Sequence, residues 1–236
     1  MSNTFYAPGE QRAEKVHALF ATIARRYDLI NDVQSFGMHR RWKRRLVALA
    51  GVSSGDRALD ICCGTGDITL ALAAQGADAT GLDFTEAMLA VAKQKPATGK
   101  VQFVQGDAMK LPFPDNSFGA VTVGYGLRNL ASWETGLGEM IRVARPGGRV
   151  VVLDFGKPDN SLWRTLYFSY LRLCVPLFGL LFARRADAYA YILESLKHYP
   201  AQRGVEEEMR AAGMKNVRVV NLIGGAMSFN YGEKAG

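Results

Sequence analysis

Three aspartates follow runs of apolar residues in a way that could serve ligand binding. Asp60 lies in a glycine-rich segment (58–66), Asp83 ends a second apolar run, and Asp107 follows a third. If these runs are parallel strands, their carboxyl ends share one edge of a sheet, which is where ligands bind in such sheets. Carboxylates attract cations and accept hydrogen bonds from hydroxyl and amino groups. The three positions therefore predict a site for a nucleotide-like molecule.

The segment around Asp60 has the form of a strand, a glycine turn and a helix. Gly64 and Gly66 let the backbone approach a ligand closely, next to the free N–H groups of the helix start. A dinucleotide fingerprint requires a third glycine, where this chain has Thr69. Asp60 and Asp67 would also repel a pyrophosphate. Taken alone, the segment fits either a cationic ligand or an ordinary turn with solvated acids.

The two later aspartates favour S-adenosylmethionine, which carries an ammonium and a sulfonium group and no phosphate. A carboxylate at Asp83 can accept hydrogen bonds from both ribose hydroxyls. Asp107 can accept one from the adenine amino group. Cys62 and Cys63 lie beside the turn and are interpreted as small fillers rather than nucleophiles. The three cysteines form no C-x-x-C pair, so we expect neither a disulfide framework nor a bound metal.

Composition and charge leave several partners open. The chain has 236 residues, 48% of them hydrophobic and 22% charged, which fits one α/β domain with a sizeable core. A net charge of +7 admits nucleic acid, an anionic membrane or an acidic substrate. Much of the excess lies in 40–45 and at Arg184 and Arg185, where a solvated helix face is the common alternative. Residues 1–11 lack a signal-peptide pattern, so we expect cytoplasmic residence.

Alternating strands and helices predict a doubly wound α/β sheet. Before it, an amphipathic helix is expected from Glu14 to Arg26. The aromatic and polar residues of 27–43 are interpreted as a flap over the ligand end of the sheet, with a packed N-terminal cap as the alternative. We divide the chain into a helical cap (1–50) and a catalytic domain (51–236). Strands are expected at 58–61, 78–83, 101–104, 120–123, 149–154, 216–222 and 226–231.

The insertion at 161–200 is the second informative region. Residues 162–182 are apolar and aromatic but contain Arg164, Arg172 and Pro176. A central arginine argues against a helix that spans a bilayer. The segment can line a pocket for an apolar substrate or contact a membrane surface. A buried packing helix is the alternative.

Several motifs together resemble the UbiE/MenG family of quinone-biosynthesis C-methyltransferases. The resemblance covers about residues 16–234 and implies a Rossmann-like class I S-adenosylmethionine-dependent methyltransferase. Such a fold has a seven-stranded, mostly parallel sheet whose last strand, here about 226–231, is antiparallel. The motifs are Tyr27-Asp28-x-Ile30-Asn31 with Ser35, His39 and Trp42; Phe113-Pro114-Asp115; Gly126-Leu127-Arg128-Asn129; Pro146-Gly147-Gly148; and 187–200.

The resemblance also implies which residues bind the cofactor. Gly124 stands where the family usually has a serine, so only a backbone contact is expected there. Other departures are Gln34 for an aliphatic residue, Asp154 for a glutamate and Asn230 for a histidine. They leave open which quinone is used. The full expected set is Asp60, Gly64, Thr65, Gly66, Asp83, Phe84, Asp107, Ala108 and Gly124.

The implied reaction methylates a ring carbon of a prenylated quinol in menaquinone biosynthesis. The reduced ring must be the nucleophile, because its hydroxyl groups feed electrons into the ring. We assign substrate-side roles to Arg128, Asn129, His39 and Tyr189. Arg128 and Asn129 are best placed to orient a quinol oxygen or a water that acts as the base, with turn stabilisation as their alternative role.

Demethylmenaquinol is the expected substrate. The alternatives are the 2-polyprenyl-6-methoxy-1,4-benzoquinol of the ubiquinone pathway and 2-phytyl-1,4-naphthoquinol. An RNA methyltransferase fits less well, because residues 124–127 are not the Asn/Asp-Pro-Pro-Tyr typical of amino-directed enzymes, and a protein that binds S-adenosylmethionine without turnover is a further alternative. We expect no nucleic-acid partner and a transient association with the inner face of the membrane, because the substrate is a lipid. A homodimer is left open.

Overall fold

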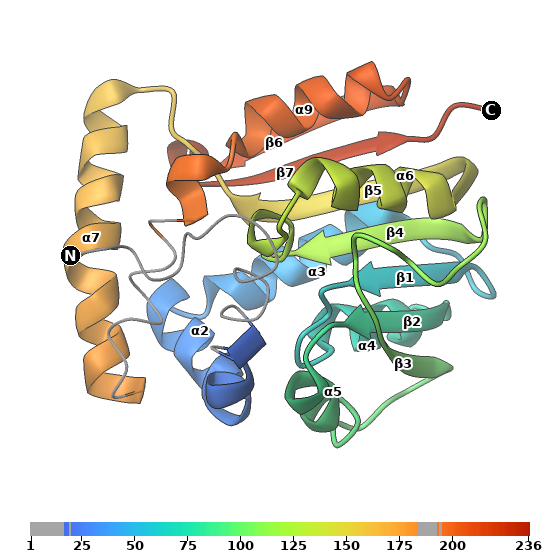
Figure 1. Cartoon of the computed structure of the whole chain (residues 1–236), viewed down its shortest axis with the longest axis horizontal. Coiled ribbons are helices and arrows are strands. Elements are labelled where there is room, and N and C mark those ends of the chain that lie inside the picture. Colours follow the sequence, from blue (N-terminus) through green and yellow to red (C-terminus); the bar gives the residue numbers. More distant parts are fainter. Residues whose placement is uncertain (1–16, 19, 184–192, 194) are drawn as a thin grey trace.

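A single seven-stranded sheet lies at the centre of the protein (Figure 1). The structure is a computed structural model that describes residues 17–18, 20–183, 193 and 195–236. The strand order is β3-β2-β1-β4-β5-β7-β6, and β7 runs antiparallel to both of its neighbours. This confirms the predicted sheet with its antiparallel last strand. The strands are β1 (Arg57–Ile61), β2 (Asp78–Asp83), β3 (Val101–Gln105), β4 (Phe118–Gly124), β5 (Ala144–Phe155), β6 (Lys215–Leu222) and β7 (Met227–Glu233).

The beginning of β5 differs most from its predicted bounds. Ala144 already pairs with Phe118, and after an irregularity in the ladder Arg149 pairs with Ala120. The Pro146-Gly147-Gly148 motif, which lies before the strand expected at 149–154, is therefore an irregular start of β5. Gly147 within it has φ +72°, a conformation that side chains with a Cβ rarely adopt.

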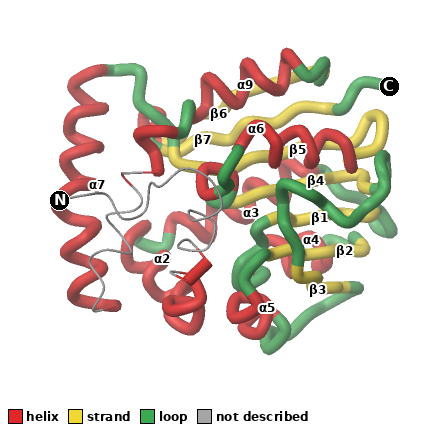
Figure 2. The backbone as a smooth tube through the Cα atoms, in the orientation of Figure 1, coloured by secondary structure: helices red, strands yellow, loops and turns green. Residues whose placement is uncertain are grey.

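Helices cover both faces of the sheet, so its central strands are buried on both sides. Successive residues of β5 alternate between two clusters. Val150 packs with α6 (Trp133–Val143) and α9 (Ala201–Ala211), whereas Val151 packs with α3 (Met38–Ala50) and α4 (Asp67–Ala74). The α5 helix (Glu86–Ala92) packs beside β2 and β3. Figure 2 shows the yellow sheet between these red helices.

The N-terminal segment is a packed helical cap rather than a loop-like flap. Residues 17–18 and 20–23 are helical, and η1 (Ala24–Arg26) and α2 (Tyr27–Ser35) follow. Phe36 and Gly37, with φ of +50° and +72°, then turn the chain into α3. The α2 helix lies beyond the carboxyl ends of the parallel strands, to which the arrowheads of β1 and β4 point in Figure 1.

The predicted insertion forms a 23-residue helix, α7 (Ser161–Ala183), which stands beside the carboxyl ends of the strands and contacts α2 (Figures 1 and 2). Within the described part of the chain, no helix combines the length and apolar character needed to cross a membrane. Arg184, Arg185 and Tyr189 lie outside the described residues. Residues 187–192 and 194 of the 187–200 motif lie there too.

Candidate active site

Two cavities meet where the parallel strands end. The first, of about 580 Å³, lies over the loops that follow β1 to β4. It includes the point between β1 and β4 where the strand order reverses, which is where ligands of such sheets bind. We call it the polar cavity because Asp83 and Asp107, the two aspartates of the later strands that are expected to bind the cofactor, line it. Among the residues that line it are Gly64, Asp83, Phe84, Gly106, Asp107, Ala108, Gly124 and Asn129.

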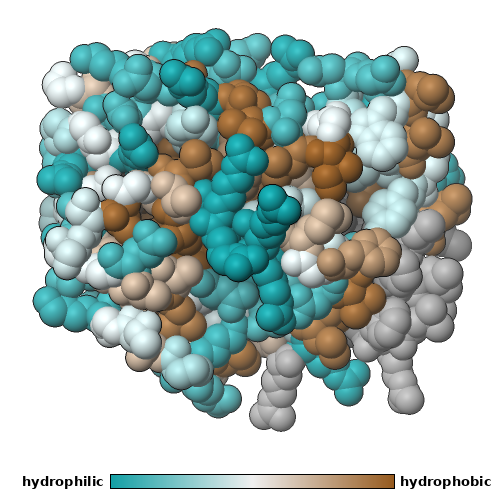
Figure 3. Space-filling model, turned by 180° about the vertical axis from the view of Figure 1, so that it is seen from behind, coloured by the Kyte–Doolittle hydropathy of each residue, from teal (hydrophilic) through white to brown (hydrophobic). Residues whose placement is uncertain are grey.

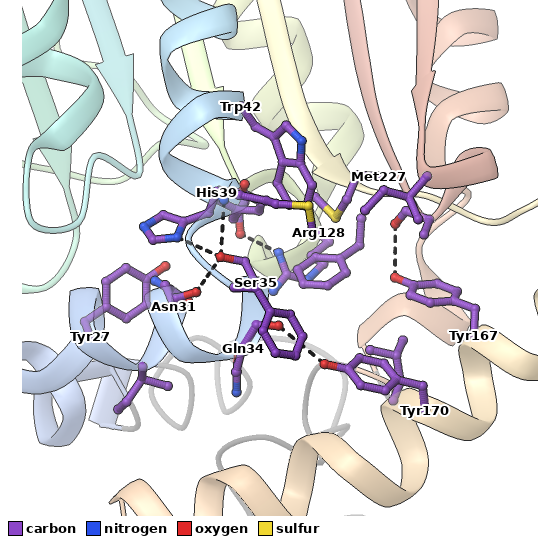
Figure 4. Close-up of a pocket in the computed structure, with 18 of the residues that line it drawn as sticks. Tyr27, Asn31, Gln34, Ser35, His39, Trp42, Arg128, Tyr167, Tyr170 and Met227 are labelled. Atoms are coloured by element: carbon purple, nitrogen blue, oxygen red, sulfur yellow. Dashed lines mark hydrogen bonds between the residues drawn. The ribbon is translucent and has the colours of Figure 1, made fainter.

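The second cavity, of about 470 Å³, lies between the helical cap and α7. Aromatic and aliphatic side chains form most of its wall, so we call it the apolar cavity. Figure 4 shows α2 and α3 on one side and α7 on the other, with Arg128 between them. Among the residues that line it are Ile30, Gln34, Phe36, His39, Trp42, Arg128, Trp163, Tyr167, Tyr170 and Met227.

Asp83 is held rigidly at the edge of the polar cavity. Its Oδ2 accepts a hydrogen bond from the Gly64 N–H and its Oδ1 accepts one from the Thr85 N–H, both 2.8 Å long. Burial raises the pKa of Asp83, and these two backbone donors moderate the rise. Each oxygen keeps a further acceptor site. The geometry suits a carboxylate that receives a pair of ligand hydroxyls.

The far side of the polar cavity combines an acceptor with an aromatic surface. The Asp107 Oδ1 accepts a hydrogen bond of 2.8 Å from the Met109 N–H, which fixes the carboxylate. Phe84 is half exposed, and its ring meets the His17 ring edge-on with centroids 5.4 Å apart. A flat heterocycle with an exocyclic amino group fits between such an acceptor and such a ring.

Three predicted cofactor contacts lie behind the cavity wall instead. Asp60 is fully buried, where it accepts hydrogen bonds from the hydroxyls of Thr69 (2.8 Å) and Thr122 (2.9 Å). Burial raises the pKa of Asp60 to about 7, and the two hydroxyls moderate the rise. Thr65 is buried as well and does not line the cavity. Asp60, Thr65 and Gly66 support the turn and do not line this cavity, and their contacts with the cofactor remain predictions.

Two glycines at the site are explained by close approach. A Cβ at Gly66, whose φ is +81°, would lie 2.8 Å from the Phe103 ring. A Cβ at Gly124 would lie 2.4 Å from the Ile68 Cδ1, so a serine there would displace Ile68. Gly124 lines the polar cavity and has no side chain to offer, which agrees with the expected backbone contact.

A chain of charged groups connects the helical cap to the glycine turn. The Lys95 ammonium lies between Asp28 of α2, at 2.7 Å, and Asp67 of α4, and Lys43 of α3 reaches Asp67 at 2.8 Å. The Thr65 hydroxyl donates to Asp28 at 2.7 Å. Burial would raise the pKa of Asp67, but the two lysines outweigh it and lower the pKa to about 2. We call Asp28, Thr65, Asp67, Lys43 and Lys95 the cap latch.

Arg128 borders the apolar cavity and belongs to a buried ion pair. Its Nη1 lies 2.7 Å from Asp154 Oδ1, its backbone N–H donates to Asp154 Oδ2, and the Tyr125 carbonyl accepts a further hydrogen bond from Nη1. The guanidinium lies 4.6 Å from the centroid of the Phe155 ring. A fixed cation on an apolar wall can orient a ring oxygen and stabilise its anion. The predicted turn-stabilising role and the substrate-side role are therefore compatible.

His39 borders the same cavity as a neutral imidazole with a defined tautomer. The Ser35 hydroxyl donates to the Asn31 carbonyl at 2.6 Å, so it has only acceptor sites left for His39 (Figure 4). It accepts from the His39 backbone N–H, and the His39 Nδ1 lies 2.9 Å away. Nδ1 therefore carries the hydrogen, and Nε2 keeps its lone pair. Burial, together with Lys43, lowers the pKa of His39, which keeps it uncharged at neutral pH.

Three aromatic residues line both cavities and so mark their junction: Phe20, Tyr27 and Tyr125. Sequence reasoning named Tyr27 only as part of a motif and gave Tyr125 no role. The signal for Tyr125 was an aromatic residue between two glycines directly after a strand. Asn129 lines the polar cavity and donates to the Tyr125 carbonyl at 3.1 Å, so it lies on the cofactor side of the junction.

No cluster of the described residues could hold a metal ion. Burial raises the pKa values of Cys62 and Cys63 well above those of ordinary thiols, with Asp83 as the next contributor. These cysteines therefore remain thiols, as expected of fillers. His198 is exposed and lines neither cavity.

Comparisons with known proteins agree with this geometry. Residues 9–234 match the ubiE/COQ5 methyltransferase family. Demethylmenaquinone methyltransferases from the Staphylococcus aureus strains JH9 and Newman are each 42% identical to this chain over 234 residues, 97% of this chain and 97% of theirs.

Solved structures share the fold at low sequence identity. A methyltransferase from Thermotoga maritima has a TM-score of 0.60 at 17% identity, over 92% of this chain and 99% of its own. Phosphoethanolamine N-methyltransferase 2 from Haemonchus contortus, solved with S-adenosyl-L-methionine, has a TM-score of 0.59 at 18% identity, over 80% of this chain and 51% of its own. The fold is that of the class I S-adenosylmethionine-dependent methyltransferases, as predicted.

Proposed function

Because the chain belongs to the ubiE/COQ5 methyltransferase family, we propose that it transfers a methyl group from S-adenosylmethionine to a ring carbon of demethylmenaquinol. The name of the 42% identical relatives supports this substrate. The structural observation that carries the proposal is the junction of a polar cavity with an apolar one. A methyl transfer between a polar cofactor and a lipid requires these two environments to adjoin, so that the ring carbon can contact the methyl group.

The polar cavity fits the cofactor in the chemistry of its residues. Asp83 would hold the ribose hydroxyls, and Phe84, Asp107 and Ala108 would hold the adenine. When bound, the cofactor supplies an electrophilic methyl group on a sulfonium ion. Phe20, Tyr27 and Tyr125 exclude water from the junction, and the faces of aromatic rings favour a cation at close range.

The apolar cavity fits a quinol whose ring points toward the junction. Arg128 and His39 are among the polar residues that line it, and most of its other lining residues are hydrophobic. Phe36, Met38, Leu166 and Ile223 line this cavity and are also exposed, so they mark its mouth. A prenyl tail that leaves through such a mouth is selected weakly by length, because each buried methylene contributes about 0.8 kcal/mol.

The residues around the ring can make its carbon nucleophilic. The Nε2 of neutral His39 accepts the hydroxyl proton of the quinol, and the Arg128 guanidinium stabilises the resulting negative charge on oxygen. The electrons of that oxygen then increase the nucleophilicity of the neighbouring ring carbon. Arg128 and His39 act on the substrate side, while Asp83 acts on the cofactor side.

We further propose that the cavity mouth faces the surface of a membrane. Viewed from behind in Figure 3, hydrophobic side chains gather toward the edge where α7 lies. Arg40 and Arg41 are exposed beside the mouth residue Met38. Flotation with anionic liposomes should therefore show binding at low salt that weakens at high salt, and Phe36→Ser combined with Leu166→Ser should weaken it further. Failure to float at low salt contradicts this surface assignment.

The experiment that tests the function is methyl transfer with labelled cofactor. Purified protein would receive demethylmenaquinol, 2-polyprenyl-6-methoxy-1,4-benzoquinol and 2-phytyl-1,4-naphthoquinol with reductant, alone and in competition at matched tail length. We expect label in menaquinol and the highest kcat/KM for the demethylnaphthoquinol ring. A preference for the benzoquinol overturns the substrate, and the absence of label in every quinol overturns the function.

A further inference from the structure

Tyr125, one of the three aromatic residues at the junction, has an unusual backbone conformation. Its φ is +64°, a left-handed conformation that is unfavourable for a bulky residue. Three hydrogen bonds hold its backbone there. The Tyr125 N–H donates to the Leu153 carbonyl at 2.7 Å, and its own carbonyl accepts from Arg128 and Asn129.

The strained backbone places the Tyr125 side chain between the two cavities. The side chain lines both of them, and its ring meets the Phe155 ring at a centroid distance of 6.1 Å. Tyr125 directly follows Gly124, which has no side chain and stands at the end of β4. The side chain that this strand end contributes to the junction is therefore that of Tyr125.

The Tyr125 hydroxyl is buried and has no hydrogen-bond partner among the described residues. A buried hydroxyl without a partner is destabilising, because it has lost its hydrogen bonds to water. By contrast, the Tyr167 hydroxyl in the wall of the apolar cavity donates to the Ala226 carbonyl at 3.0 Å. Burial raises the pKa of Tyr125 well above that of an ordinary tyrosine, with Tyr27 and Asp154 adding to the rise, so the hydroxyl remains a donor. A ligand acceptor at the junction would complete it.

We propose that the Tyr125 hydroxyl donates a hydrogen bond to the quinol oxygen next to the methyl-accepting carbon, and thereby directs methylation to carbon instead of oxygen. The cofactor end of the junction presents a sulfonium cation, which accepts no hydrogen bond. The quinol oxygen is the acceptor that the proposed function brings there. This inference rests on that function and deepens it by naming the residue that selects the reacting atom.

Selection is needed because a deprotonated quinol can react at two atoms. Its electron pair can form a carbon–methyl bond or an oxygen–methyl bond, and in both cases the sulfur–methyl bond breaks and sulfur keeps the pair. On the carbon route the hydroxyl proton goes to His39. After the carbon–methyl bond has formed, the methylated carbon loses its proton to water, and His39 returns its proton to the oxygen. A hydrogen bond from Tyr125 engages one lone pair of that oxygen and holds the ring with its carbon facing the methyl group.

The test is Tyr125→Phe, which keeps the ring and its contact with Phe155 and removes only the hydroxyl. We expect an unchanged or higher Tm, an unchanged cofactor Kd, and about tenfold weaker binding of a quinol analogue measured without cofactor. With cofactor and quinol, Tyr125→Phe should form an O-methyl ether. The ether cannot be oxidised to a quinone, so after oxidation mass spectrometry distinguishes it from the C-methylated product. A matched control is Tyr167→Phe, which should lower Tm and leave the ratio of ether to C-methylated product unchanged.

The outcomes separate the inference from the proposed function. Wild-type enzyme that methylates no quinol overturns the function. A second outcome overturns the role of Tyr125 alone. In it the wild-type enzyme methylates the quinol, while Tyr125→Phe binds the quinol analogue equally well and makes no ether. If Tyr125→Phe does not fold, the inference can still be tested by the binding of two quinol analogues to the wild-type enzyme. A quinol analogue that lacks the hydroxyl next to the accepting carbon should bind about tenfold more weakly than its parent, and equal binding overturns the inference.

Discussion

The polar cavity and the apolar cavity share a wall at Tyr27 and Tyr125, but the rest of their walls is built differently. The polar cavity consists mainly of residues that directly follow strands, such as Gly64 after β1 and Asp83 at the end of β2. The sheet fixes these positions, and short loops carry them. The apolar cavity combines segments that are far apart in the chain, with Trp42 in α3 and Tyr167 in α7.

This difference separates two requirements of the reaction. Rigid strand ends suit the binding of a cofactor with fixed polar groups, because backbone N–H groups hold each carboxylate in place. A lipid needs an apolar enclosure and an exit for its tail, which helices packed over the sheet provide. Variants that affect one cavity and not the other can therefore break or sharpen the comparison.

The largest effect is expected at Arg128, the cation of the apolar cavity. Arg128→Met leaves Asp154 buried without its partner, which should cost about 3–5 kcal/mol of unfolding free energy. Turnover should fall by about 10²–10³-fold, since a charge-stabilising group is lost. Adding Asp154→Asn should restore much of the stability, because the amide oxygen can still accept from backbone N–H groups, without restoring turnover. A double variant with near wild-type kcat would make Arg128 a structural residue.

His39→Gln should lower kcat by about a hundredfold, the lower range for a lost general base. In the wild type, kcat should fall as the pH drops through the pKa of folded His39, which burial holds below the ordinary value of about 6.5, because protonated Nε2 has no lone pair. The lowered pKa also means that the unfolded chain takes up the proton first. The free energy of unfolding should be full above about pH 6.5 and decrease as the pH falls through the lower folded pKa. If kcat of His39→Gln still falls at low pH as in the wild type, another group is the base.

Asp83→Ala tests the polar cavity by itself. Calorimetry should show S-adenosylmethionine binding weakened more than tenfold, because a hydrogen bond to a charged group contributes about 1.5–3 kcal/mol. The affinity for a quinol analogue should stay within twofold. Asp115→Asn is the control, since the Asp115 side chain is 67% exposed and pairs with Arg142 away from both cavities. Equal losses of cofactor and quinol affinity in Asp83→Ala would mean that the cavities are not separable.

The smallest effect is expected in the cap latch. Lys95→Met removes the cation that joins Asp28 of the cap to Asp67 at the glycine turn, yet all three side chains are partly exposed, and such pairs contribute only about 0–1 kcal/mol. We expect the KM values for cofactor and quinol to rise together by about two- to fivefold. Lys100→Met, at an exposed lysine paired with Asp78, should change neither. A change confined to one substrate would show that the latch does not couple the cavities.

The same contrast explains what the sequence could predict. Strand positions, the glycine turn and Asp83 follow from patterns within a few residues, because a strand end fixes the residue behind it. Asp60 has the same local pattern, but its side chain points to Thr69 and Thr122 beneath the turn. No local pattern distinguishes the two aspartates, since the distinction depends on which neighbouring strand supplies a hydroxyl.

The apolar side was less predictable because its contacts are distant in sequence. Arg128 was predicted at the substrate, but its pairing with Asp154 depends on β4 and β5 lying side by side. His39 was also predicted, whereas its tautomer depends on how Ser35 at the end of α2 meets α3. Tyr189 lies outside the described residues and remains a prediction.

The most direct test of the two-cavity account is a crystal structure with S-adenosylhomocysteine and a non-reactive analogue of demethylmenaquinol. The account predicts the ribose at Asp83, the quinol ring between α2 and α7 beside Arg128, and its methyl-accepting carbon facing the sulfur between Tyr27 and Tyr125. A quinol ring bound outside the apolar cavity, or a sulfur that points away from the Tyr27–Tyr125 junction, would contradict it.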